Sequence, residues 1–306
     1  MKRISFVVPV YRNERAVTMT YQQICQVCAS DLTTYAYQIV FIDDGSDDGS
    51  LGELLAIRAN DPNVRVVSFT RNFGQMAAIL AGFKQATGDV VVQLSADLQD
   101  PIALVPQMIA EYERGSEVVV CHREHREDAL SARLTSRALY SILRLSFPQI
   151  PGGGFDYLLL DRKVVDAFNA VEVRNRFFQG DILWFGYKTT FIPYTRAKRA
   201  IGRSQYTFAK RLKNSLDAIL DSSYLPIRFI SLVGVLTACA GFVYAADIVY
   251  ARLTYNIPYT GWAPIMILIL VIGGLIMLML GIIGEYVWRI YDEVRGKPNY
   301  VVRNVF

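Results

Sequence analysis

The most informative stretch of the sequence is Val90-Val-Val-Gln-Leu-Ser95-Ala-Asp97-Leu-Gln99-Asp-Pro101, because an apolar run is followed there by a carboxylate and a carboxamide two residues apart. Alternation along an extended chain would point the side chains of Asp97 and Gln99 in the same direction. Oxygen ligands of this kind suit Mg²⁺ or Mn²⁺ that carries a diphosphate. We therefore expect a site for a metal and a diphosphate at the carboxyl end of a buried strand.

Apolar strands and helices alternate through the chain up to residue 121. The strands are expected at 4–10, 37–42, 64–69, 90–94 and 117–121, and the helices at 16–30, 51–60, 75–87 and 101–114. This alternation predicts an α/β domain with a parallel, doubly wound sheet. Ligands of such sheets bind beyond the carboxyl ends of the strands. The polar residues that follow three of these strands are Asp43, Asp44, Arg71, Asn72, Asp97 and Gln99.

Two long apolar segments, 226–250 and 262–288, lie near the end of the chain. Each exceeds the roughly 20 residues that cross a bilayer, and Trp and Tyr near their ends are typical of membrane spans rather than of buried core helices. The segment between them, 251–261, has one charged residue, Arg252, whereas basic residues lie before the first apolar segment and after the second. The positive-inside rule therefore predicts a multi-pass membrane protein with both termini in the cytosol and the loop between the spans outside. The apolar run after Met1-Lys-Arg is too short for a signal peptide.

These patterns predict five parts. They are a cytosolic domain at 1–203, which includes an amphipathic interface helix at about 129–146, a juxtamembrane amphipathic helix at 204–224, a transmembrane hairpin at 225–289 and a cytosolic tail at 290–306. The 129–146 helix would equally suit an ordinary surface helix packed on the domain. The formal net charge of +4 is too small to favour a nucleic-acid partner, and the four cysteines show no zinc-binding pattern.

Two further segments carry residues that suit chemistry. The run Gly152-Gly-Gly-Phe-Asp156 is typical of a flexible loop that positions a reactive carboxylate, although a plain turn aspartate would look the same. The segment 196–206 combines four cations with Gly202 and Ser204, which suits a phosphate grip or positive charge beside a membrane.

Five motifs in order resemble the family 2 glycosyltransferases that act on polyprenyl phosphates, such as bactoprenol glucosyltransferases and dolichol-phosphate mannose synthases. The motifs are Val7-Val-Pro9-Val-Tyr11-Arg-Asn13-Glu14, Phe41-Ile-Asp43-Asp44-Gly45-Ser46, Thr70-Arg71-Asn72-Phe73-Gly74, Ala96-Asp97-Leu98-Gln99-Asp100-Pro101 and Gly284-Glu285-Tyr286. The resemblance implies a GT-A domain, a nucleotide-sugar donor, Mg²⁺ or Mn²⁺, and inversion at the anomeric carbon.

The resemblance also implies roles for individual residues. Asp97 and Gln99 would hold the metal ion, and Asp156 would lie beside the acceptor. The acceptor phosphate monoester is largely dianionic at neutral pH, so Asp156 would orient it or act as an auxiliary base. The residues expected to bind the nucleotide sugar are Pro9, Tyr11, Glu14, Asp43, Asp44, Arg71, Asn72, Arg199, Gly202 and Ser204.

Three positions depart from the family pattern. Ser95 stands where an aspartate is often found, so the metal site loses a carboxylate. Gln205 stands where a lysine is frequent, and Arg203 or Lys210 would replace its charge. Leu158 stands where an arginine often follows the acid, so we expect another cation, Arg162, to contact the acceptor phosphate.

We therefore expect a hexosyltransferase that moves a sugar, UDP-glucose being the favoured donor, onto undecaprenyl phosphate. The product would serve cell-surface glycan modification, such as that of the O-antigen of lipopolysaccharide. The alternatives are a GDP-mannose-dependent transferase and a non-catalytic nucleotide-sugar-binding subunit. A processive synthase would need a Gln-x-x-Arg-Trp motif, which is absent. A homo-oligomer, a tetramer, is expected, because the amphipathic helices offer a surface for pairing protomers and the resemblance implies assembly.

Overall fold

The computed structural model describes residues 1–123, 141, 144, 148–151, 154–171, 177–195, 225–255 and 262–306. The chain divides into two compact units, Met1–Ser222 with Pro298–Phe306, and Ser223–Lys297. The helix expected at 129–146, apart from positions 141 and 144, and the juxtamembrane helix expected at 204–224 lie outside the described residues.

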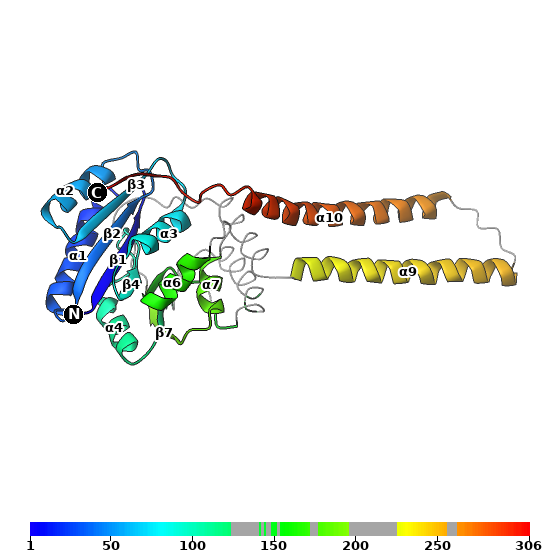
Figure 1. Cartoon of the computed structure of the whole chain (residues 1–306). Helices are drawn as coiled ribbons and strands as arrows, with labels where there is room; N and C mark the ends of the chain where they lie inside the picture. Colours follow the sequence, from blue (N-terminus) through cyan, green and yellow to red (C-terminus); the bar gives the residue numbers. More distant parts are fainter. Residues whose placement is uncertain are drawn as a thin grey trace. The chain divides into compact units, whose positions relative to one another are not determined.

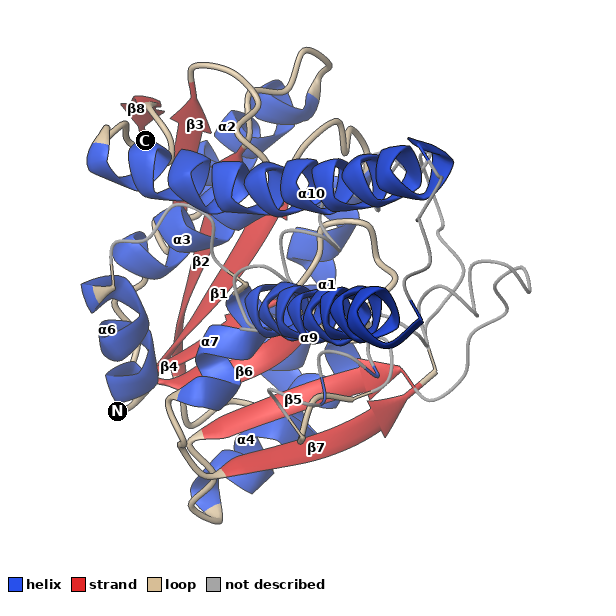
Figure 2. Ribbon diagram, turned by 90° about the vertical axis from the view of Figure 1, so that its right-hand side faces the viewer, coloured by secondary structure: helices blue, strands red, loops and turns tan. Residues whose placement is uncertain are grey.

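One sheet organises the first unit, and the described residues contribute eight strands to it in the order β7-β5-β6-β4-β1-β2-β3-β8 (Figures 1 and 2). Strands β1 to β4 are mutually parallel and β7 is parallel to β5, whereas β6 and β8 run antiparallel to their neighbours. The sheet is therefore mostly parallel, as the sequence predicted. The strands are β1 (Arg3–Val10), β2 (Ala36–Asp43), β3 (Val64–Phe69), β4 (Val90–Gln93), β5 (Val118–Arg123), β6 (Tyr157–Asp161), β7 (Thr189–Tyr194) and β8 (Val302–Val305).

Helices cover both faces of this sheet. Side chains alternate between the faces along each strand, so each face has its own apolar core. Phe6 and Val8 of β1 join the core beneath one set of helices, and Val7 joins the core beneath the other set. The first set is α1 (Ala16–Ser30), α2 (Ser50–Asn60) and α4 (Val105–Glu113), which follows the 3₁₀ turn Ile102–Leu104. The second set is α3 (Gln75–Gln85), α6 (Arg162–Ala170) and α7 (Phe178–Trp184).

The predicted elements of the first half are confirmed with small shifts at their ends. The predicted helix 16–30 and the predicted strand 64–69 match α1 and β3 in both bounds. The predicted helix 101–114 begins as a 3₁₀ turn, and the strand predicted at 117–121 extends to Arg123. Strands β6, β7 and β8 and helices α6 and α7 were not predicted.

The strand β8 covers the edge of the sheet at β3. Phe306 and Val66 exchange backbone hydrogen bonds of 2.8 and 3.2 Å, and Thr70 N–H donates to the carbonyl of Val301 at 3.1 Å. The ring of Tyr300 stacks on Phe69 with ring centroids 4.9 Å apart. Residues that follow both apolar segments in the sequence therefore complete the sheet of the first unit.

The second unit consists, in its described part, of helices α9 (Leu225–Tyr255) and α10 (Trp262–Val294). The apolar windows Ile227–Tyr244 and Val271–Val294 are long enough to cross a membrane by length and composition. Their apolar side chains, among them Leu236, Phe242 and Met277, are exposed. The two apolar segments predicted from the sequence are therefore helical.

Candidate functional site

The carboxyl edge of the sheet gathers the polar residues singled out in the sequence. The parallel strands β1 to β4 end at this edge, and β5 and β7 end there too, with Arg123 opposite Tyr194. Strand β6 runs the other way and begins there, with Tyr157 opposite Cys121. Asp156, the residue before β6, therefore lies at the same edge as Asp97.

The turn after β2 holds two buried carboxylates. Asp44 accepts hydrogen bonds from the N–H groups of Phe73 at 2.7 Å and Gly74 at 2.9 Å, so it anchors the residues that lead into α3. Burial raises the pKa of Asp44 to about 6, although these two N–H groups oppose the rise. Asp43 accepts from Ser46 N–H at 3.1 Å and from the Ser68 hydroxyl at 3.0 Å.

A close backbone contact joins this turn to the segment after β3. Gly45 has a φ of 66°, and a Cβ atom there would lie only 2.4 to 2.8 Å from backbone atoms of Arg71 and Asn72. Only glycine fits this conformation and this approach. Arg71 and Asn72 are exposed at the edge, and the Arg71 guanidinium lies 4.0 Å from the ring centroid of Phe73.

The loop after β1 packs along the loop after β2. Tyr11 N–H donates to the Asn13 side chain at 3.0 Å, and the Arg12 guanidinium pairs with Asp47 at 2.6 Å. Glu14 is exposed in this loop, and Pro9 is paired with Ile42 within the sheet. Half of the ten residues expected to bind the nucleotide sugar thus lie at or just after the ends of two adjacent parallel strands; they are Pro9, Tyr11, Glu14, Asp43 and Asp44.

The acidic turn after β4 differs from the extended chain that the sequence predicted. Strand β4 ends at Gln93, Leu98 has a left-handed φ of 59°, and Gln99 N–H donates to Asp97 Oδ1 at 3.2 Å. The prediction of an extended alternation that aims Asp97 and Gln99 in one direction is therefore wrong. A turn, rather than a strand, presents these two side chains at the edge.

Ser95 links the carboxylates of this turn. Its Oγ lies 2.8 Å from Asp97 Oδ1 and 2.5 Å from Asp100 Oδ2. Asp97 and Asp100 are both buried. The hydroxyl that stands where a further carboxylate was expected thus bridges the two remaining acids.

The oxygen ligands of this turn fit a divalent metal that also binds a diphosphate. Within the described residues, no group of three His, Cys, Asp or Glu side chains could enclose a metal ion. Mg²⁺ at nucleotide sites commonly takes one or two carboxylates from the protein and its other ligands from phosphates and water. Asp97, with the amide oxygen of Gln99, is chemically suited to that arrangement.

Arg123 and Asp156 form an ion pair beside the acidic turn. The Arg123 guanidinium lies 3.3 and 3.4 Å from the two carboxylate oxygens of Asp156, and the Arg123 side chain is 17% exposed. Sequence reasoning missed Arg123, because it stands in the charged run His122–Arg126, which is typical of a solvated loop. Its position at the end of a strand was the signal that could have identified it.

Arg162 lies at the opposite end of β6 and has a structural role. Its guanidinium donates to the carbonyl oxygens of Gly88, at 2.5 and 2.9 Å, and Ala86, at 3.0 Å. The expectation that Arg162 contacts an acceptor phosphate is therefore wrong.

Tyr194 connects the ion pair to the acidic turn. Its hydroxyl donates to Asp100 Oδ1 at 2.7 Å, and Tyr194 faces Arg123 where β5 pairs with β7. The ring of Tyr194 also packs edge-on against Tyr157, whose hydroxyl donates to the carbonyl of Pro101 at 3.1 Å. Both tyrosines thus fix the acidic turn.

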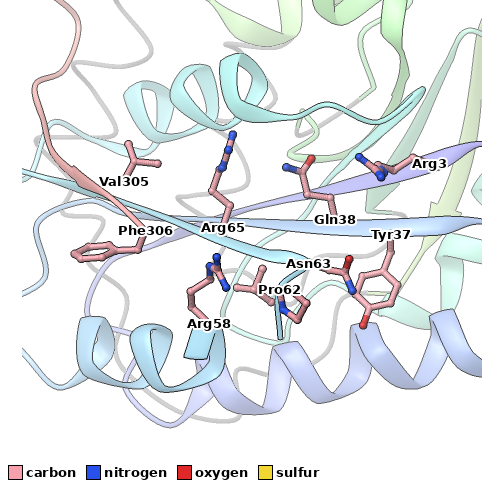
Figure 3. A pocket seen from close by; sticks show the side chains of 10 residues that line it. Arg3, Tyr37, Gln38, Arg58, Pro62, Asn63, Arg65, Val305 and Phe306 are labelled. Atoms are coloured by element: carbon pink, nitrogen blue, oxygen red, sulfur yellow. The ribbon is translucent and has the colours of Figure 1, made fainter. Parts of the chain in front are cut away.

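The expected diphosphate-binding residues Arg199, Gly202 and Ser204 lie outside the described residues. A cavity of about 400 Å³ lies at the opposite end of the strands, near the amino ends of β1 and β3, and is lined by Arg3, Arg58 and Arg65, among others (Figure 3). Arg65 donates to Gln85, which ends α3, whereas Arg58 belongs to α2 on the other face. These cations do not converge, so the carboxyl edge is the better candidate site.

Comparisons with known proteins agree with this geometry. The family described as "Glycosyl transferase family 2" matches residues 5–168. The SfII prophage-derived bactoprenol glucosyl transferase of Shigella flexneri is 34% identical over 98% of this chain and 97% of its own length. The undecaprenyl-phosphate 4-deoxy-4-formamido-L-arabinose transferase of Yersinia enterocolitica is 33% identical over 100% of this chain and 94% of its own length.

A solved structure shares the fold. It is glucosyl-3-phosphoglycerate synthase from Mycobacterium tuberculosis, crystallised with Mn²⁺, uridine diphosphate and phosphoglyceric acid. The TM-score is 0.52 at 18% sequence identity, and the match covers 71% of this chain and 76% of that one.

Proposed function

Because this chain belongs to glycosyl transferase family 2, we propose that it transfers a hexose, with inversion, from a nucleotide sugar to a polyprenyl phosphate. The observation that carries the proposal is the meeting of two groups at one sheet edge: the Asp97 turn, suited to a metal diphosphate, and the Arg123–Asp156 pair, suited to an anionic acceptor. The full-length relatives named for bactoprenol and undecaprenyl phosphate support the choice of acceptor.

On the donor side, the nucleoside would lie over the ends of β1 and β2, near Tyr11 and Asp43. Asp97, with Gln99, would hold Mg²⁺ or Mn²⁺ on the diphosphate. A metal ion bound there supplies positive charge where negative charge develops on the departing nucleoside diphosphate. Arg199, Gly202 and Ser204 would complete the phosphate contacts, in keeping with the family resemblance.

On the acceptor side, a phosphate oxygen would attack the anomeric carbon as the bond from that carbon to the donor diphosphate breaks. A phosphate monoester has a second pKa near 6, so it is already largely dianionic at neutral pH and needs little help from a base. Asp156 would therefore orient the acceptor. The positive charge of Arg123 would offset the repulsion between two anions, the acceptor phosphate and the donor diphosphate.

The two apolar helices support a membrane location for this reaction. We propose that α9 and α10 cross the inner membrane as a hairpin, with the catalytic unit and both termini in the cytosol. A polyprenyl phosphate would then present its headgroup to a site fed by water-soluble donors. The favoured substrates are UDP-glucose and undecaprenyl phosphate, with a homotetramer as the working assembly.

A non-catalytic nucleotide-sugar-binding subunit is the second candidate, and the specific observation in its favour is Ser95 in place of a carboxylate. The two candidates differ in what Asp97 does. An Asp97→Ala variant of a transferase loses turnover, whereas the same variant of a scaffold keeps its assembly and its cellular effect.

The deciding experiment is lipid-linked product formation. The full chain in detergent would be incubated with undecaprenyl phosphate, Mn²⁺ or Mg²⁺, and a panel of labelled UDP- and GDP-sugars. Metal-dependent label in the lipid phase from one donor is the expected result, and it would identify the sugar. No lipid label from any donor, with a folded protein and an active control enzyme, would contradict the proposed function.

A further inference from the structure

A continuous network of polar side chains crosses the candidate site from the acceptor side to the metal side. We propose that Tyr194 is a positioning residue that couples the acceptor-side pair Arg123–Asp156 to the metal-side carboxylate of Asp97. The inference rests on the proposed function and deepens it, because it assigns to one phenol hydroxyl the alignment of both halves of the reaction.

Neighbouring members of this polar network are close to one another at every step. Asp156 pairs with Arg123 at 3.3 Å, and Arg123 faces Tyr194 on the neighbouring strand, where the two side chains interact electrostatically. Tyr194 donates to Asp100 at 2.7 Å, and Ser95 lies 2.5 Å from Asp100 and 2.8 Å from Asp97. Tyr194, Asp100 and Asp97 are buried members of this network, and buried hydrogen-bonded groups of this kind are held in one orientation.

The hydrogen count explains why Tyr194 matters to Asp97. The Ser95 hydroxyl has one hydrogen but two carboxylate neighbours, so it can donate to only one of Asp97 and Asp100 at a time. The Tyr194 hydroxyl supplies Asp100 with its own donor. Ser95 lies closer to Asp100 than to Asp97, so the donor from Tyr194 is what allows the Ser95 hydrogen to turn to Asp97, the residue that would hold the metal.

The same hydroxyl orients the acceptor side. Tyr194 faces Arg123 and interacts with it electrostatically, while the hydroxyl hydrogen of Tyr194 points to Asp100. A planar guanidinium paired with Asp156 and flanked by Tyr194 keeps a fixed direction toward an incoming phosphate. Removing one hydroxyl should therefore disturb two binding steps at once, which a purely local packing role would not do.

Tyr194→Phe tests the inference, because it removes the hydroxyl and keeps the ring. Tyr37→Phe is the matched control, because the Tyr37 hydroxyl donates at 3.1 Å to Asp61, a buried carboxylate outside the candidate site. Three quantities would be measured on the full chain in detergent: the Mn²⁺ affinity in the presence of UDP, the KM for undecaprenyl phosphate, and the melting temperature.

Loss of an outer-shell partner typically weakens metal binding about tenfold or more. We expect Tyr194→Phe to weaken Mn²⁺ binding about tenfold and to raise the acceptor KM at least about threefold, with a melting temperature close to that of Tyr37→Phe. Tyr37→Phe should leave both binding constants at wild-type values. An Mn²⁺ affinity of Tyr194→Phe within twofold of wild type would overturn the inference.

A double-mutant cycle between Ser95→Ala and Arg123→Lys gives a second test. The two residues do not contact each other directly, so their effects on Mn²⁺ affinity should simply add unless Tyr194 links them. We expect a deviation from additivity of about threefold in the native background and none in the Y194F background. Additive effects in both backgrounds would contradict the coupling. Because Mn²⁺ binding is read without turnover, a wild-type chain that transfers no sugar would refute the proposed function and still leave this test readable.

Discussion

Replacing Arg123 with glutamine should impair acceptor use and hardly change stability. The Arg123–Asp156 pair spans 3.3 Å, but the Asp156 side chain is 42% exposed, so solvent screens the pair. Such a pair stabilises the fold by about 1 kcal/mol or less. A charged hydrogen bond from a guanidinium to a bound phosphate contributes about 1.5–3 kcal/mol. Losing it raises the acceptor KM by about 10- to 100-fold, since about 1.4 kcal/mol corresponds to tenfold.

Arg162→Gln is the opposite case and serves as the control. The Arg162 guanidinium donates three times to the carbonyls of Gly88 and Ala86 and is 29% exposed. Losing these contacts should cost about 3 kcal/mol of stability. For a unit of this size, that lowers the melting temperature by about 6–12 °C. Arg162 lies at the other sheet edge, so the acceptor KM should not change.

The assay is steady-state transfer to undecaprenyl phosphate at saturating donor, paired with thermal unfolding of the same preparations. The two arginine variants should show crossed phenotypes: a raised KM with near-normal melting for Arg123→Gln, and a normal KM with low melting for Arg162→Gln. An unchanged acceptor KM in Arg123→Gln would refute the reasoning, because the ion pair would then have no part in acceptor binding.

Three other substitutions test the site and the core. Asp44 has its pKa raised from 3.8 to about 6 by burial, so the stability it contributes is present below about pH 4 and is lost as pH rises through 6, a difference of about 3 kcal/mol. The melting temperature of wild type relative to Asp44→Asn should therefore fall between pH 4.5 and 7; a pH-independent difference would exclude this. Ser95→Asp should lower the melting temperature without metal, because three carboxylates then repel one another. It should also enlarge the rise in melting temperature on adding Mn²⁺. A rise with Mn²⁺ no larger than that of wild type would show that Ser95 is not beside the metal. The fully buried Gln93 has no hydrogen-bond partner for its amide among the described residues, so Gln93→Met should stabilise by about 1–3 kcal/mol, and a lower melting temperature would show that the amide is bonded in solution.

The first half of the fold was predictable because its pattern is local. Strands of apolar residues, helices closed by glycine, and polar residues at strand ends follow one another in a regular order up to residue 121. Strand β6 and helix α7 have only five and seven residues and no distinctive pattern. Strand β8 pairs with β3 across most of the chain, and no local pattern reveals such a pairing.

The sequence predicted which residues form the candidate site better than it predicted how the backbone arranges them. Asp44 and Asp97 lie at the expected sheet edge because strand order brings carboxyl ends together. The left-handed backbone of Leu98 could not be read from an ordinary leucine, so the turn at Asp97 was missed. Arg123 was missed because charged neighbours concealed a strand end.

The pairing of β8 with β3 sets an order of events in biosynthesis. Residues 302–305 leave the ribosome only after both apolar helices have been made, so the edge of β3 stays unpaired until then. The catalytic unit thus cannot finish folding as an independent N-terminal piece, as most domains do during synthesis. The sheet is complete only when β8 has been synthesised after α9 and α10. A nascent chain stalled within α10 would therefore expose the edge of β3 to chaperones and proteases.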